Sequence, residues 1–380
     1  MDTLDPGGLQ KLLDVLSKRG YSLIGPTVRD GTIVYDAITT IKDLPRGWTD
    51  VQEPGMYKIK KRTDEAFFAF TVSPFSWKRF LFPPRQQLFT ATKAGKSFQI
   101  ETKNGPGLDT PARYALVGVR SCELQAIAIQ DKVFAQGEYS DPIYRSLRER
   151  AFIVAVNCVQ AGGTCFCVSM GTGPRANCAY DLVLTEILLH DGSHYFIVES
   201  GSAAGNDVLE DIPHISAQDI DRRRLDEGIE HAKGQMGRTL DTTDIKQVLM
   251  NNFEHQEWDS VAKRCLACAN CTLVCPTCFC STVEDTTDLT GYHAERWRRW
   301  DSCFTMDFAK VAGGNIRPST RARYRQWMMH KLSYWFDQFG TAGCVGCGRC
   351  ITWCPVGIDI TAEAQAIREG SLTTASTDAT

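Results

Sequence analysis

The chain has 380 residues, a formal net charge of -3, 43% hydrophobic residues and 16 cysteines. This length suits two domains, and the hydrophobic fraction is ordinary for a globular protein. The small negative charge gives no reason to expect a nucleic-acid partner. No apolar run reaches the ~18 residues that would predict a transmembrane helix.

The first ten residues, MDTLDPGGLQ, lack the basic start and apolar core of a secretory signal. Many cysteines without such a signal favour a reducing compartment, here the cytoplasm, and metal ligation rather than disulfides. The cysteines form two groups, because five lie between Cys122 and Cys178 and eleven lie between Cys265 and Cys354.

Residues 1–250 are predicted to form an α/β domain. The leucines of residues 8–19 lie on one face of a helix, and residues 21–38 read as a strand pair around Asp30 and Gly31. The short apolar run at 68–72, FAFTV, is also expected to be a strand.

Two further apolar runs, at 115–119 and 151–156, read as buried strands with a helix between them, which indicates a βαβ unit. A hairpin around Asp191 and Gly192 follows. The segment 244–264 is expected to be a helix that leads into the next domain.

Five cysteines accompany the predicted βαβ unit. Cys122 and Cys158 each follow a strand, and open α/β sheets place their sites at that edge. Cys165 and Cys167 come soon after Cys158 in a loop whose glycines permit a bent backbone. We therefore expect a 4Fe–4S cluster here, with Cys178 as a spare thiol, and its four ligands would be Cys122, Cys158, Cys165 and Cys167. The alternative is that these cysteines are small buried side chains.

The strongest motif is a pair of similar cysteine runs, CLACANCTLVCP at 265–276 and CVGCGRCITWCP at 344–355. The spacing C-x2-C-x2-C-x3-C-P is the iron–sulfur run of bacterial ferredoxins. Three thiolates on one loop cover three corners of a cubane, and the fourth reaches the neighbouring cluster. The expected ligands of cluster one are therefore Cys265, Cys268, Cys271 and Cys354, and those of cluster two are Cys344, Cys347, Cys350 and Cys275. Zinc sites need neither the third cysteine nor the proline.

These runs predict that residues 251–366 form a mainly α-helical ferredoxin-like domain with two 4Fe–4S clusters. The small polar residues of 367–380 predict a flexible tail. The cluster held by the N-terminal cysteines would be a third 4Fe–4S cluster.

Three cysteines are surplus to the eight ligands: Cys278, Cys280 and Cys303. They cover the clusters, replace one predicted ligand, or bind a further metal together with Asp301. A basic, tryptophan-rich segment lies beside them and includes Arg321 and Arg325. This segment is either a solvated helix face or a docking face for an acidic redox partner.

No motif for two-electron chemistry is present in the sequence. The GTGP at 171–174 lacks the G-x-G-x-x-G frame, and no Walker motif or nucleophile elbow occurs. The sequence therefore predicts an electron-transfer subunit without a catalytic residue or substrate site of its own. The alternatives are a reductase that uses the N-terminal cysteines, for example on polysulfide, and a zinc-stabilised scaffold.

Several motifs together resemble a known family over roughly residues 110–365: GVRSCELQAI, GGTCFCVSMGTGP, CLACANCTLVCPTCFC, RWDSCF, RARYRQWMMHKL and FGTAGCVGCGRCITWCPVGIDIT. They are similar to the beta iron–sulfur subunit of cytoplasmic NiFe hydrogenases of the sulfhydrogenase type, and also to the iron–sulfur subunit of anaerobic sulfite reductases. The resemblance implies a subunit that relays electrons in a larger NAD(P)-linked complex. It implies a partner that binds FAD and NAD(P), and a second partner that carries the catalytic metal centre.

Overall fold

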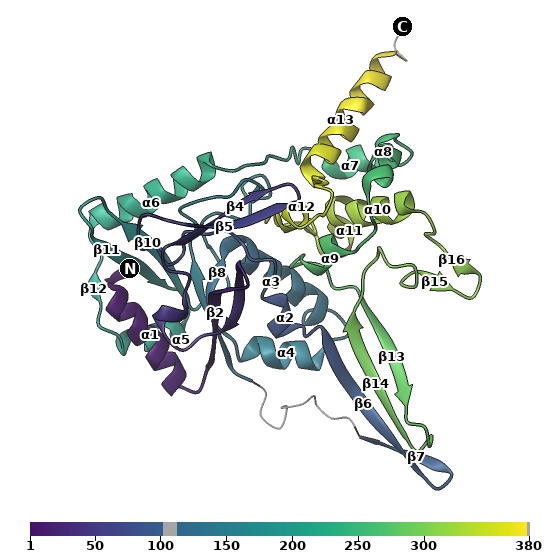
Figure 1. The fold of residues 1–380 in the computed structure, drawn as a ribbon, viewed down its shortest axis with the longest axis horizontal. Helices are drawn as coiled ribbons and strands as arrows, with labels where there is room; N and C mark the ends of the chain where they lie inside the picture. The colour runs from purple at the N-terminus through teal and green to yellow at the C-terminus, as the bar shows by residue number, and fades with distance from the viewer. Residues whose placement is uncertain (102–111, 378–380) are drawn as a thin grey trace.

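The computed structural model describes residues 1–101 and 112–377 (Figure 1). The N-terminal half is built on an eight-stranded mixed sheet, in the order β12-β1-β11-β10-β9-β8-β2-β3. Its centre is parallel, since β8 pairs in parallel with both β2 and β9, and β9 pairs in parallel with β10. The strands are β1 (Asp2–Leu4), β2 (Ser22–Arg29), β3 (Thr32–Ala37), β8 (Tyr114–Arg120), β9 (Phe152–Val156), β10 (Leu182–Leu188), β11 (His194–Ser200) and β12 (Ile215–Ser216).

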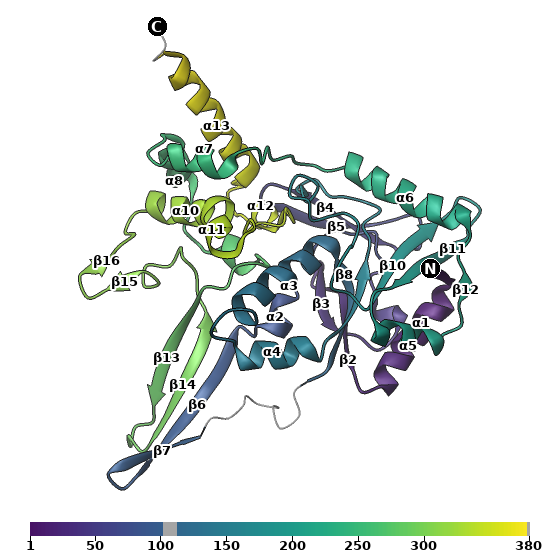
Figure 2. The ribbon, with the colours of Figure 1, turned by 180° about the vertical axis from the view of Figure 1, so that it is seen from behind.

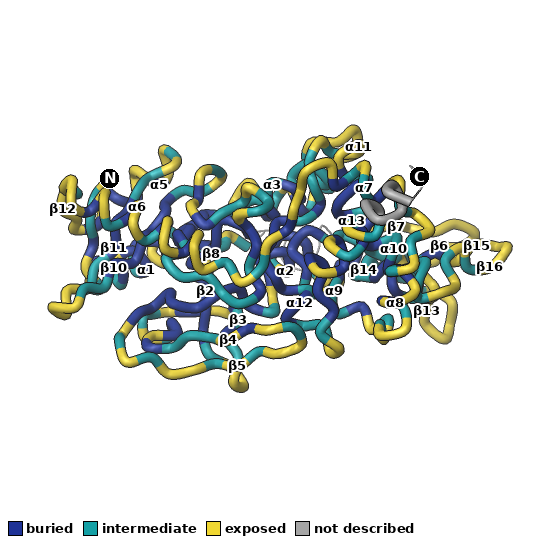
Figure 3. The backbone as a smooth tube through the Cα atoms, turned by 90° about the horizontal axis from the view of Figure 1, so that it is seen from above, coloured by how far each residue is buried: buried dark blue, intermediate teal, exposed yellow. Residues whose placement is uncertain are grey.

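Helices cover both faces of this sheet. One face packs on α1 (Pro6–Lys18) and α5 (Ala203–Glu210), and the other packs on α2 (Lys78–Leu81), α3 (Ser121–Phe134) and α4 (Pro142–Glu149). The central strands are buried on both sides, which is why they read as unbroken apolar runs. A further helix, α6 (Asp219–Gly234), packs on β10 and β11. Figure 3 shows the buried backbone concentrated around β8, β2 and α3.

The predicted βαβ unit is β8, α3 and β9, and both predicted hairpins are present as β2-β3 and β10-β11. The run at 68–72 is not a strand. Its backbone amides have no ladder partner, and several of them are satisfied by side-chain carboxylates instead. Glu186 accepts hydrogen bonds from the N–H groups of Phe67 and Phe68 at 2.7 and 2.8 Å. Buried carboxylates thus hold this apolar segment as a loop.

The single helix expected over 244–264 is two helices, α7 (Ile245–Asn251) and α8 (Glu257–Arg264). Asn252 causes the break, because its side-chain amide donates to the carbonyl of Val248 at 2.8 Å and its own carbonyl accepts from the indole of Trp258 at 2.9 Å. At the other end, α13 runs over Ile360–Thr377, where a flexible tail from residue 367 was expected.

A second sheet, of four strands, joins the two halves of the sequence in the order β13-β14-β6-β7. It consists of β6 (Arg85–Ala94), β7 (Ser97–Glu101), β13 (Ser281–Thr287) and β14 (His293–Trp300). The strands form an arm that projects from the body (Figures 1 and 2). The C-terminal half therefore contains strands as well as helices, including the short pair β15 (Lys310–Val311) and β16 (Gly314–Asn315).

The basic segment forms α10 (Thr320–Met329), a π-helical turn (His330–Tyr334) and α11 (Trp335–Phe339). Arg321 and Arg325 both pair with Glu254, at 2.6 and 3.0 Å. These two arginines therefore already have an acidic partner within the chain. Among the described residues, no helix is both long and apolar enough to cross a membrane.

Candidate iron–sulfur centres

The two cysteine runs adopt the same backbone. Ala267 and Ala269 of the first loop have φ angles of 51° and 69°, and the equivalent Gly346 and Gly348 of the second have 64° and 76°. Left-handed residues at the same two positions bend each loop around its three cysteines. A one-turn helix follows each loop, α9 (Asn270–Leu273) in the first and α12 (Arg349–Thr352) in the second.

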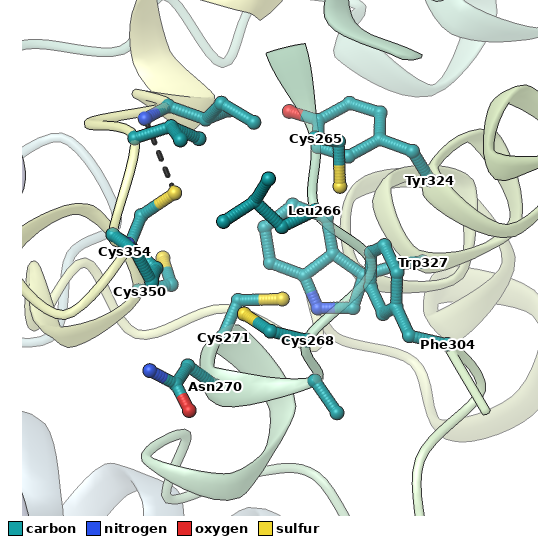
Figure 4. Close-up of a pocket in the computed structure, with 14 residues that line it drawn as sticks. Cys265, Leu266, Cys268, Asn270, Cys271, Phe304, Tyr324, Trp327, Cys350 and Cys354 are labelled. Atoms are coloured by element: carbon teal, nitrogen blue, oxygen red, sulfur yellow. Dashed lines mark hydrogen bonds between the residues drawn. The ribbon is translucent and has the colours of Figure 1, made fainter. Parts of the chain in front are cut away.

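The residues expected to hold cluster one line one cavity (Figure 4). Aromatic side chains of Phe304, Tyr324 and Trp327 form its other wall. Backbone amides point at two of the sulfurs, because Ala267 donates to Cys265 at 3.4 Å and Ile358 donates to Cys354 at 3.3 Å. The sulfurs that face this space in Figure 4 belong to Cys265, Cys268, Cys271 and Cys354. Cys350 also lines it.

The residues expected to hold cluster two are also neighbours. Burial raises the pKa of Cys350 well above its ordinary value, and the nearby thiols of Cys344, Cys347 and Cys275 raise it further. Burial likewise raises the pKa of Cys344 to about 12, against a backbone amide of Gly346 that donates to its sulfur at 3.5 Å. Four buried thiolates repel one another unless positive metal lies between them. The donor set therefore fits an iron–sulfur cluster.

A buried lysine, Lys331, completes this environment. Its ammonium donates to the sulfur of Cys275 at 3.0 Å, to the hydroxyl of Thr277 at 3.1 Å and to the carbonyl of Gly343 at 3.3 Å. Burial acts to lower the pKa of Lys331, but the thiols of Cys275 and Cys278 raise it well above the usual value. A fixed positive charge beside a thiolate ligand favours the more negative, reduced state of a cluster. The sequence alone had not indicated this role, although Lys331 belongs to the basic segment.

The N-terminal cysteines also gather in one place. Cys122 lies in the first turn of α3, and Cys158 follows β9 and accepts a hydrogen bond from Arg120. Burial raises the pKa of Cys165 to about 12, with the neighbouring thiol of Cys158 adding to the effect. Burial and then the thiols of Cys158 and Cys165 raise the pKa of Cys167. Cys178 lies apart, beside Gln125.

No three His, Cys, Asp or Glu side chains approach closely enough to hold a single metal ion, as far as the structure describes the chain. This is as true of the eight dicluster cysteines as of the N-terminal group.

The loop of Cys165 and Cys167 packs directly on the loop of cluster two. The amide of Phe166 donates to the carbonyl of Gly346 at 2.9 Å, and Thr172 donates to the carbonyl of Val345 at 2.6 Å. Cys122, Cys167 and Cys347 belong to one buried apolar cluster. The sequence motifs did not reveal this contact, because the residues that meet are far apart in the chain.

A buried ion pair ties the same two regions together. Arg349, in the second run, pairs with Glu123, the residue after Cys122, and both side chains are almost fully buried, at 0% and 1% exposure. Glu123 also accepts from the hydroxyl of Tyr35 at 2.9 Å and the indole of Trp77 at 3.0 Å. The position of the second loop is therefore fixed relative to α3.

The three surplus cysteines line a small pocket beside Trp327, His330 and Lys331. A hydrogen bond from Cys303 lowers the pKa of Cys280 to about 7. The carboxylate of Asp301 does not line this pocket. It accepts instead from the amide of Ser302 at 2.7 Å and the hydroxyl of Thr305 at 2.8 Å.

Replacing Gly348 with alanine is expected to loosen the second loop. A Cβ there would lie 2.4 Å from the carbonyl oxygen of Thr164. The left-handed backbone costs an L-residue roughly 1–2 kcal/mol, and the overlap adds about 1–3 kcal/mol. Thermal unfolding and iron retention of Gly348→Ala measure the loss. Ala269→Gly, at the equivalent position of the first loop, is the matched control and should not destabilise the protein.

Residues 264–358 match the family described as a 4Fe-4S dicluster domain, and they include both cysteine runs. The chain is also 32% identical over 335 residues to sulfhydrogenase 2 subunit beta of Pyrococcus furiosus, a match that covers 87% of this chain and 94% of that protein. No solved structure matches. Both findings confirm the resemblance seen in the motifs and support two 4Fe–4S clusters in the C-terminal half. This chain, an iron–sulfur electron-transfer protein, therefore belongs to the family of sulfhydrogenase beta subunits.

Proposed function

We propose that the chain relays electrons in a cytoplasmic NAD(P)-linked NiFe hydrogenase, between a flavin subunit that binds NAD(P) and the other redox centres. The observation that carries the proposal is the presence of two separate sets of buried, mutually neighbouring cysteines in one dicluster domain. The match to a sulfhydrogenase beta protein favours a hydrogenase over a sulfite reductase as the host complex. All 16 cysteines are free thiols, which agrees with a reducing compartment.

We propose that the cluster-bearing core is ferredoxin-like, with crossed ligand sets. Cluster one takes the first three cysteines of the first run and Cys354, and cluster two takes the first three of the second run and Cys275. The matching backbone of the two loops supports this assignment. The chain's residues bind the clusters, exclude water with aromatic side chains, and place a buried lysine beside cluster two. The clusters, when bound, supply one-electron transfer.

A third cluster in the N-terminal half is also part of the proposal, held by Cys122, Cys158, Cys165 and Cys167. Its support is the convergence of these buried thiols and their contact with the loop of cluster two. A centre in this position would extend the relay from cluster two into the N-terminal half. The region between the two centres is rigid, because hydrogen bonds and the pair of Glu123 with Arg349 hold both loops.

Metal analysis tests the two parts separately. Anaerobically purified protein should carry iron and acid-labile sulfide in equal amounts, about 8 of each for two clusters and about 12 for three. Cys122→Ser should remove about four irons and leave the spectrum of the other two clusters unchanged. Cys178→Ser is the matched control and should keep all the iron. A wild-type value of about 8, unchanged in Cys122→Ser, would remove the third cluster but not the relay, whereas zinc in place of iron would remove both.

A further inference from the structure

The base of the projecting arm brings two surplus cysteines together. Cys280 directly precedes β13, and Cys303 follows β14 by three residues. These strands pair antiparallel, with Ser281 opposite Trp300, and the ladder continues with a hydrogen bond of 2.9 Å from the amide of Asp301 to the carbonyl of Cys280. The turn that follows carries Cys303 back, so that its thiol donates a hydrogen bond to the sulfur of Cys280.

This pair lies next to both cluster sites. Cys278, which lines the same pocket, is hydrogen-bonded to Cys275, an expected ligand of cluster two. Phe304, the residue after Cys303, lines the cavity of cluster one. The indole of Trp327 lines both the cavity of cluster one and the pocket of the surplus cysteines. Electrons therefore need to cross little more than packed side chains to pass between the clusters and this pair.

The pair is not needed as a ligand set. Each expected cluster already has four cysteines without it, and Asp301, the carboxylate nearest in sequence to Cys303, is engaged in its own turn. Two adjacent thiols with no metal to hold have a simple remaining chemistry, which is the reversible formation of a disulfide.

We propose that Cys280 and Cys303 form a redox-active pair that exchanges two electrons with the two clusters. In the oxidising direction the two S–H bonds break and one S–S bond forms. Two electrons leave the sulfurs, one to each oxidised cluster, and two protons are released. In the reducing direction two reduced clusters return one electron each, the S–S bond breaks, and each sulfur takes up one proton. The pair thus converts two one-electron carriers into a two-electron store.

The pocket also provides a path for the protons. His330 lines it and makes a 3.2 Å hydrogen bond to the exposed side chain of Gln338. The released protons pass to this imidazole and from there to water. Lys331, which lines the pocket too, is already hydrogen-bonded to Cys275, so it stabilises a thiolate rather than accepting a proton.

Trapping of thiols in the intact complex tests this proposal. The complex is poised anaerobically at a series of potentials, quenched in acid, alkylated with N-ethylmaleimide and digested without reductant. At high potential, mass spectrometry should find the peptides of Cys280 and Cys303 joined by a disulfide, and at low potential both should be alkylated. The change should follow a two-electron curve. Complete alkylation of both cysteines at every potential that oxidises and reduces the clusters would overturn the pair. Cys178 is the internal control and should stay alkylated throughout.

Variants separate this role from metal ligation and from the relay itself. Cys280→Ser and Cys303→Ser should each keep the full iron content, and each should take up two electrons fewer per chain than the wild type in a coulometric titration. A loss of about four irons would make these residues cluster ligands and overturn the proposal. If either serine variant proves unstable, Cys303→Ala, which places a small apolar group in this buried site, replaces it. Normal iron with an unchanged electron count would also reject the pair, while leaving the relay intact.

Discussion

Cys350→Ser and Cys265→Ser are each expected to stop physiological electron flow through the whole complex. Each variant removes a ligand from a different cluster, so the iron content should fall by about four in either case. Because the clusters act in series, loss of one should lower NAD(P)-linked turnover to the background level. The partner subunits should still react with artificial dyes, because dyes exchange electrons with them directly.

Two assays made side by side measure this effect: hydrogen-dependent NAD(P) reduction and hydrogen-dependent dye reduction. Cys178→Ser is the control, because this thiol lies apart from every cysteine group and should leave both rates unchanged. Full physiological flux in either ligand variant, with its iron confirmed as missing, would mean that electrons bypass that cluster. The serial relay would then be wrong.

Arg349→Met is expected to give the largest loss of stability. The variant leaves the carboxylate of Glu123 buried with only neutral donors, and removing one member of a buried ion pair typically costs about 3–5 kcal/mol. Glu123→Gln leaves the guanidinium of Arg349 without its counter-charge and should cost a similar amount. Anaerobic chemical denaturation, followed by tryptophan fluorescence, measures both changes.

The double variant Glu123→Gln/Arg349→Met provides the decisive comparison. Since neither charge is left alone, its free energy of unfolding should fall by less than the sum of the single losses. Arg145→Met is the control, because Arg145 and Glu149 form an exposed pair on α4 and the change should be small. Additive losses in the double variant would show that the two side chains do not act as a pair.

The sequence predicted the elements whose signal is local. The spacing of the two cysteine runs specifies two similar loops, and unbroken apolar runs identify β8 and β9 because both faces of these strands are covered. The FAFTV segment misled, since its apolar residues are buried but its amides bond to Glu186 and not to a neighbouring strand. Periodicity also could not locate the break at Asn252, which depends on one side chain and on Trp258.

Contacts between distant segments were beyond sequence reasoning. The motif GVRSCE contains Glu123, but nothing in its pattern names Arg349 as the partner. Likewise, the arginines and tryptophans of β14 suggested a basic helix face, whereas they alternate along a strand that pairs with β6. A partner strand so far away in the chain leaves no trace in a local pattern.

The pairing of β6 with β14 also has a consequence for the order of folding. Thr92 faces His293 in this ladder, so the chain must close a loop of about half its length before the arm is complete. Contacts of such long range form slowly, and during synthesis β6 and β7 emerge well before β14. Until then β6 has an open edge that other chains can pair with. Completion of the arm also sets the base of the hairpin that leads into Cys280 and Cys303, so late folding and the assembly of the cluster region are coupled. A chain released too early would therefore be prone to aggregate through the arm.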